Sequence, residues 1–205
     1  MNESGKITTQ GIKYAGSKLK IIPYIIEIVS SLKGVRSVLD GFSGTTRVSQ
    51  AFAQMGYNTT SNDLAVWSEV FATCYLKANK PAAYYQEIID ELNALKGFDG
   101  WFTEHYGGDE AESKKPFQRK NTQKLDAIRC AIDQLQLAWE DKCVLLTSLM
   151  LALDKVDSTL GHYVAYLSKW SPRSYKDLLL QVPKRYELTG NNRVLQGDVF
   201  DAIRQ

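Results

Sequence analysis

The segment 35–56 constrains the fold most, because it places a short strand directly before a turn of small residues and an amphipathic helix. VRSVLD (35–40) is β-branched and apolar, and GFSGTT (41–46) follows it. Apolar residues then recur at the helical spacing i, i+3, i+4 and i+7, namely Val48, Ala51, Phe52 and Met55. YNTTSNDL (57–64) indicates a second strand that ends in an acid. This order predicts an α/β fold with a parallel pair of strands and a right-handed crossover.

The rest of the chain predicts two regions of different class. IIPYIIEIVSSL (21–32) indicates an apolar helix before the first strand, and NNRVLQGDVFDAIRQ (191–205) indicates a turn, a short strand and a helix start. Helical spacing dominates the middle, over 66–79, 82–95, 121–139 and 143–156, with a long loop at 96–120. We therefore expect an α/β core built from 1–66 and 191–205, and a helical insertion over 67–190.

The turn at 41–46 has the properties of a ligand-binding loop. Small residues let the backbone approach a ligand closely, and the free N–H groups of a helix N-terminus point at it. Asp63 follows at about the spacing, roughly 20 residues, at which an acid binds the hydroxyls of a ribose. A tight strand-to-helix turn without a ligand is the alternative. The G-x-G-x-x-G fingerprint is absent, which argues against a nicotinamide cofactor and a dehydrogenase.

Composition excludes several classes of protein. The 205 residues are 44% hydrophobic and 23% charged, as in a folded globular protein, and the formal net charge is only +2. No apolar run is long enough to span a membrane, and MNESGKITTQGIKYAG lacks the apolar region of a secretory signal, so we expect a cytoplasmic protein. The three cysteines and two histidines are widely spaced, which predicts reduced thiols and no metal site.

Several blocks of sequence occur in the order found in one enzyme family. Lys13-Tyr14-Ala15-Gly16-Ser17-Lys18 precedes the apolar helix, and Asp40-Gly41-Phe42-Ser43-Gly44 and Asn62-Asp63 follow it; the later blocks are 124–129, 145–156, 159–166 and 197–200. This series resembles DNA adenine methyltransferases over nearly the whole chain. The resemblance implies a partial Rossmann-like, class I methyltransferase sheet with a large helical target-recognition insertion, and S-adenosylmethionine as the cofactor.

The resemblance also implies roles for individual residues. Tyr14 and Lys18 would contact the methionine end of the cofactor, and Phe42 and Gly44 would shape the turn under it. Asp40 is also a predicted cofactor-binding residue, and Asp63 would bind the ribose. The adenine ring would lie at Asp198, Val199 and Phe200. For Tyr14 and Phe42 the alternative is ordinary core packing. Thr46 replaces the second glycine of the family's F-x-G-x-G turn, and its Cβ is expected to weaken cofactor binding.

Two basic segments fall where the family places target recognition, between the second and third cofactor blocks. Double-stranded DNA is therefore the expected partner, since phosphate binding needs clustered cations and neighbouring aromatic residues can stack on an exposed base. A solvated charged face is the alternative. The predicted DNA-binding residues are Lys114, Lys115, Arg119, Lys120, Lys124, Lys169, Arg173 and Lys176.

The family's methyl-transfer motif, (D/N/S)-P-P-(Y/F), is absent, because no two of the five prolines are adjacent. The resemblance therefore predicts the cofactor-binding and target-recognition part of a site-specific adenine methyltransferase that is inactive alone. This part would be either an N-terminal fragment of such an enzyme or one half of a split enzyme. In the second case we expect a second polypeptide with the D-P-P-Y motif to complete it, or self-association through the exposed strand edge at 35–40. The alternative is a non-catalytic DNA-binding or regulatory relic of the family.

Overall fold

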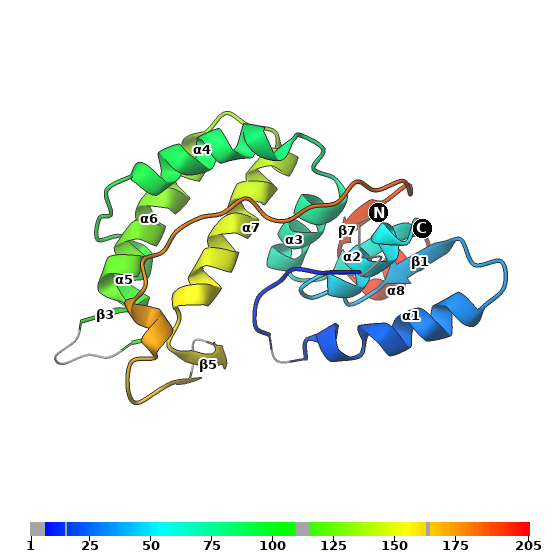
Figure 1. Cartoon of the computed structure of the whole chain (residues 1–205), viewed down its shortest axis with the longest axis horizontal. Coiled ribbons are helices and arrows are strands. Elements are labelled where there is room, and N and C mark those ends of the chain that lie inside the picture. Colours follow the sequence, from blue (N-terminus) through cyan, green and yellow to red (C-terminus); the bar gives the residue numbers. More distant parts are fainter. Residues whose placement is uncertain (1–6, 15, 110–114, 163–164) are drawn as a thin grey trace. The chain divides into compact units, whose positions relative to one another are not determined.

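The structure, a computed structural model, describes residues 7–14, 16–109, 115–162 and 165–205 and divides into two compact units (Figure 1). The first unit comprises 1–11, 16–79 and 184–205, and the second comprises 12–15 and 80–183. Helix α3 (Val66–Leu76) and the chain from 184 to 190 thus belong to the first unit, whereas the sequence boundaries placed most of α3 and all of 184–190 in the insertion.

The first unit contains a three-stranded parallel sheet in the order β1-β2-β7. Its strands are β1 (Ser37–Asp40), β2 (Asn58–Asp63) and β7 (Arg193–Gln196). Asp40 lies beside Ser61 in the first pair, and Asp63 lies beside Gln196 in the second. The α/β class and the parallel pair predicted from the sequence are confirmed, and β1 lies at one edge of this sheet.

Helices α1 (Ile22–Ser31) and α2 (Arg47–Gln54) pack against each other, and α2 also packs against β1. Pro23 stands in the first turn of α1, where its missing N–H costs no hydrogen bond. The predicted apolar face of α2 forms the core, since Val48, Ala51 and Phe52 are buried with Ile22 of α1. The burial of this face fixes the position of α2, and the first turn of α2 follows the loop 41–46 after β1.

Each of the other two strands is also followed by a helix. Helix α3 follows β2 and packs on β2 and β7, whereas the short helix α8 (Val199–Ala202) follows β7. The side chain of Asp198 caps α8 by accepting the N–H of Phe200 at 2.8 Å. The predicted strand and helix start near the end of the chain are therefore present.

The second unit is mainly helical. Its helices are α4 (Ala82–Ala94), α5 (Trp101–Tyr106), α6 (Arg119–Gln134) and α7 (Trp139–Val156), its short strands are β3 (Gly107–Gly108), β4 (Phe117–Gln118), β5 (Thr159–His162) and β6 (Ala165–Tyr166), and Pro172–Tyr175 is a 3-10 turn. The expected helix 121–139 ends earlier, because α6 ends at Gln134 and α7 starts at Trp139. None of the described helices is long and apolar enough to cross a membrane.

Candidate cofactor-binding site

The carboxyl ends of β1, β2 and β7 lie side by side, because the three strands are parallel and adjacent. They form the carboxyl edge of the sheet, which runs across the strands and is distinct from the outer strand edge at β1. The predicted residues Asp40 and Phe42 lie at the end of β1, Asp63 ends β2, and Asp198 follows β7. In open parallel sheets, ligands bind at this edge, outside the carboxyl ends of the strands. The fold therefore brings together segments from near the two ends of the sequence.

Asp63 holds the turn after β1 in place. One carboxylate oxygen accepts the N–H of Gly44 at 2.8 Å, and the other accepts the N–H of Ala65 at 3.0 Å. The N–H of Ser43 also donates to the carbonyl of Asn62 at 3.0 Å. Because a carboxylate oxygen has two lone pairs, each oxygen of Asp63 can accept one more hydrogen bond from a ligand.

Asp40 and Lys18 form a polar pair beside the same turn. Asp40 is buried and accepts the Ser49 hydroxyl at 2.8 Å, while the Lys18 ammonium lies 3.7 Å from its other oxygen. Lys18 also donates to the carbonyl of Phe42. An ammonium carries three protons, so Lys18 can hold the turn and still donate to an anionic ligand.

Exposed apolar side chains follow all three strands. Phe42 is 69% exposed, Leu64 is 73% exposed and Phe200 is 70% exposed. Core packing is therefore wrong as an interpretation of Phe42. Tyr14 is 45% exposed and is likewise not a core residue. Exposed apolar rings beside convergent polar groups are typical of a ligand site.

Thr46 adopts the left-handed conformation at the start of α2, with φ 57° and ψ 15°. This region is strained for a β-branched residue, which explains why glycine suits the position. The side chain is completely buried, and its hydroxyl accepts a hydrogen bond from the Gln50 amide at 3.1 Å. Its methyl and hydroxyl groups are therefore not on the exposed side of the turn.

A comparison with known protein families gives a match over most of the chain. The sequence profile described as D12 class N6 adenine-specific DNA methyltransferase matches residues 14–200.

The chain belongs to this family of adenine methyltransferases.

Individual relatives are also methyltransferases. Type II methyltransferase M.NlaIII of Neisseria lactamica is 25% identical over 94% of this chain and 60% of its own length. Modification methylase StsI of Streptococcus sanguinis is 28% identical over 95% of this chain and 32% of its own length. Type II methyltransferase M.CviAII of Paramecium bursaria Chlorella virus 1 is 27% identical over 82% of this chain and 53% of its own length. This chain thus spans about a third to three fifths of these relatives, and no solved structure matches it significantly.

The first block of the methyltransferase family, 13–18, is divided between the two units. Lys18 lies in the sheet unit, whereas 12–15 belongs to the helical unit. There, the Lys13 ammonium pairs with Asp157 at 2.7 Å and lies 3.7 Å from Asp154. The cofactor contact of Tyr14 stays a prediction, because Tyr14 lies in a different unit from Lys18, Phe42 and Asp63.

The predicted DNA-binding residues differ in what they contact within the helical unit. Arg119 pairs with Asp99, Lys120 with Asp177 and Arg173 with Asp157, each at 2.6–2.7 Å. Lys115 donates to the carbonyl of Glu104 at 2.7 Å. Lys114 lies outside the described residues. Lys169 and Lys176 are exposed and make no ion pair with any described residue.

Lys124 bonds to the end of a helix. Its ammonium donates to the carbonyls of Asn93 and Leu95, where helix α4 ends. A cation at this end compensates the unpaired carbonyls and the helix dipole. Partial burial lowers the pKa of Lys124.

Sequence reasoning missed the polar face of α2. Gln50 binds the backbone of Gln10 through both amide atoms, at 2.9 and 2.8 Å, and Arg47 donates to the carbonyls of Thr9 and Gly11 at 2.8 Å. Gln54 similarly donates to Thr8 at 2.9 Å. The spacing of these three side chains along one helix face is the signal that the sequence offers, but their partners are distant in sequence.

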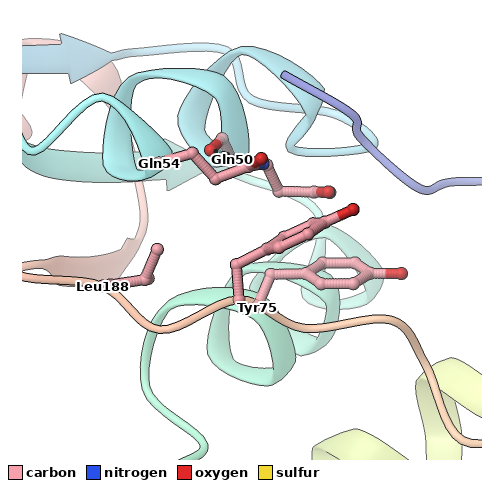
Figure 2. Close-up of a pocket in the computed structure, with 5 residues that line it drawn as sticks. Gln50, Gln54, Tyr75 and Leu188 are labelled. Atoms are coloured by element: carbon pink, nitrogen blue, oxygen red, sulfur yellow. Dashed lines mark hydrogen bonds between the residues drawn. The ribbon is translucent and has the colours of Figure 1, made fainter. Parts of the chain in front are cut away.

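A small pocket lies beside this face, lined by Gln50, Gln54, Tyr75, Tyr186 and Leu188 (Figure 2). The Tyr75 hydroxyl donates to the side-chain oxygen of Gln10 at 3.2 Å. Burial raises the pKa of the Tyr75 phenol well above its usual range, so the phenol stays neutral. The lining side chains therefore offer no charge to a ligand, unlike the edge with Asp40, Asp63 and Lys18.

Proposed function

We propose that this chain binds S-adenosylmethionine and forms the cofactor-binding and target-recognition part of an adenine-specific DNA methyltransferase. The observation that carries the proposal is the convergence of Asp40, Phe42, Asp63 and Asp198 after three adjacent parallel strands in a member of this family. When bound, S-adenosylmethionine supplies an electrophilic methyl group for the exocyclic amine of adenine. Because DNA is the proposed substrate, we also propose a cytoplasmic location.

The residues at the strand ends suit this cofactor chemically. The free lone pairs of Asp63 match a ribose diol, and the remaining proton of Lys18 matches a carboxylate. Phe42 and Phe200 present exposed rings, of which Phe200 follows the Asp198–Val199 pair assigned to the adenine. The hydroxyl of Ser43 is buried and has no partner among the described residues, which leaves a polar atom in this loop available for rearrangement on binding.

For double-stranded DNA, the arrangement of charges favours Lys169 and Lys176 over the other predicted cations. Their charges are not neutralised by a carboxylate among the described residues, so they retain their full attraction for phosphate. Tyr175 lies next to Lys176 and is 51% exposed. We therefore propose that the segment 169–176 contacts DNA, with Lys115, Arg119, Lys120 and Arg173 contributing only if their present bonds exchange for phosphate.

Methyl transfer needs groups that this chain does not contain. In the family, the D-P-P-Y motif holds the flipped adenine through hydrogen bonds and stacking, and the chain has no adjacent prolines. The edge position of β1 supports completion by another polypeptide, because an unpaired strand edge offers its N–H and C=O groups to a further strand. Helix α1, which precedes β1 in the sequence, and its flanking residues expose the apolar side chains of Ile21, Tyr24, Ile28 and Leu32.

A methylation assay tests the proposal. The purified chain is incubated with S-adenosylmethionine labelled in the methyl group and with duplex DNA containing all short adenine contexts. We expect no N6-methyladenine from this chain alone, and methylation when a polypeptide carrying the D-P-P-Y motif, encoded in frame or adjacent, is added. Strong methylation by the chain alone would contradict the requirement for completion. Dimers without such a polypeptide, detected by light scattering, would instead support self-association through β1.

A further inference from the structure

The side chain of Asn62 joins the loops that follow the two outer strands. Asn62 lies on the middle strand β2 and is 1% exposed. Its amide nitrogen donates to the carbonyl of Gly41 at 3.2 Å and to the carbonyl of Gly197 at 3.1 Å. Gly41 is the first residue after β1, and Gly197 is the first residue after β7. One amide group therefore uses both of its protons to hold the two loops at a fixed separation.

The backbone around Asn62 reinforces this link. The carbonyl of Asn62 accepts the N–H of Ser43, and the carbonyl of Asp63 accepts the N–H of Gly197, both at 3.0 Å. The loops also touch each other, because a Cβ on Gly41 would lie 2.8 Å from a methyl group of Val199. Any larger residue at position 41 would therefore force Val199 to shift, so glycine keeps the two loops close together.

The identity of the side chain is informative because it is not the one that packing alone would select. Its oxygen is buried and has no partner among the described residues. An unpaired buried oxygen destabilises the fold, whereas an apolar side chain of similar size would avoid that cost. The two donated hydrogen bonds are what an apolar residue cannot supply, and both go to the loops at the proposed site.

We propose that Asn62 is a positioning residue, which sets the distance between the part of the site that holds the methionine moiety and the part that holds the adenine. This inference rests on the proposed function, because Phe42 belongs to the first loop and Asp198 to the second. Asn62 itself contacts neither part of the cofactor. Its effect is to let both loops bind one molecule at the same time, without reorganisation after the first contact.

The test compares a ligand that reaches both loops with one that reaches only the second. S-adenosylhomocysteine contains the amino acid and the adenosine, whereas 5′-methylthioadenosine lacks the amino acid. We expect Asn62→Ala to raise the Kd of S-adenosylhomocysteine about tenfold in calorimetry, and to change the Kd of 5′-methylthioadenosine less than about twofold. Ser61→Ala is the matched control, since Ser61 is its fully buried neighbour on β2 and its hydroxyl has no partner among the described residues.

A second variant keeps the proposal testable if Asn62→Ala does not fold. Asn62→Leu preserves the approximate volume and removes the same two hydrogen bonds, and thermal unfolding shows whether either variant is folded. An equal loss of affinity for both ligands would show a merely structural role and overturn the inference, as would an unchanged Kd for S-adenosylhomocysteine. If the wild-type chain binds neither ligand, the proposed function fails first, and this inference fails with it.

Discussion

Thr46 is the residue at which the chain departs most clearly from the methyltransferase pattern. Its left-handed backbone, at φ 57°, is the conformation that a glycine would adopt without strain. The sequence shows that a side chain replaces the glycine but not where this side chain lies. In the structure it is buried and bonded to Gln50 instead of facing the exposed turn. The expected loss of cofactor affinity stays a prediction. The positive φ of Thr46 does, however, predict that this residue lowers the free energy of unfolding.

A comparison of two variants isolates this strain. Thr46→Gly and Thr46→Ala both remove the hydroxyl and the bond to Gln50, but only alanine keeps a Cβ at positive φ. We expect Thr46→Gly to be more stable than Thr46→Ala by about 1 kcal/mol, which urea unfolding measures. Equal stability of the two variants, or a more stable alanine variant, would contradict the strain.

At the scale of the elements, helix α5 shows how a side chain from a distant helix creates local structure. Asp126 of α6 accepts the N–H groups of Gly100, Phe102 and Thr103 and the hydroxyl of Thr103, at 2.6–3.2 Å. The three N–H groups are among the unpaired backbone donors at the start of α5. A Cβ on Gly100 would lie 2.7 Å from the Asp126 side chain, so the close approach requires glycine there.

Removing this cap has a defined cost. We expect Asp126→Ala to lower the free energy of unfolding by about 1–2 kcal/mol, as for the loss of a strong N-cap, and to speed amide exchange in 101–106. Asp133→Ala is the control, because Asp133 lies on the same helix and its carboxylate pairs at the surface with Arg129. Similar losses from both variants would show that the cap contributes no more stability than a surface ion pair.

Asp126 also explains what could and could not be predicted from the sequence. Hydrophobic periodicity predicts α1, α2 and the two adjacent strands, because their packing faces and turn residues are local signals. The segment 96–120 is expected to be a loop, since nothing local caps α5. Asn62 belongs with Asp63 to a family block, but the two acceptors of its side chain, Gly41 and Gly197, become neighbours only when the sheet forms.

At the scale of the whole molecule, the near-neutral net charge of +2 conceals a division between paired and unpaired cations. Most cations of the basic segment 114–124 are bonded to carboxylates or carbonyls of their own unit. Clustering in the sequence is therefore a poor guide to the charge available for DNA. The segment 169–176 keeps two exposed lysines for this purpose.

DNA binding measured at several salt concentrations tests this assignment. The slope of log K against log salt is negative, and its magnitude falls by about 0.9 for each phosphate of duplex DNA that the protein ceases to neutralise. Lys169→Ala/Lys176→Ala is therefore expected to reduce the magnitude of the slope by about 1–2. Lys33→Ala/Arg36→Ala is the control, since it removes the same charge from exposed positions of the sheet unit. An equal effect of both pairs of substitutions would indicate a non-specific effect of net charge.

Binding of S-adenosylmethionine to the purified chain, measured by calorimetry, tests the central claim most directly. We expect the wild-type chain to bind one molecule, and Asp63→Ala to weaken binding at least about tenfold, because it removes charged acceptors of the ribose hydroxyls. Asp201→Ala is the control, because it removes the same charge from an exposed carboxylate of α8, and we expect it to bind like the wild type. No binding by the wild-type chain, or equal binding by the Asp63 variant, would contradict a cofactor site at the strand ends.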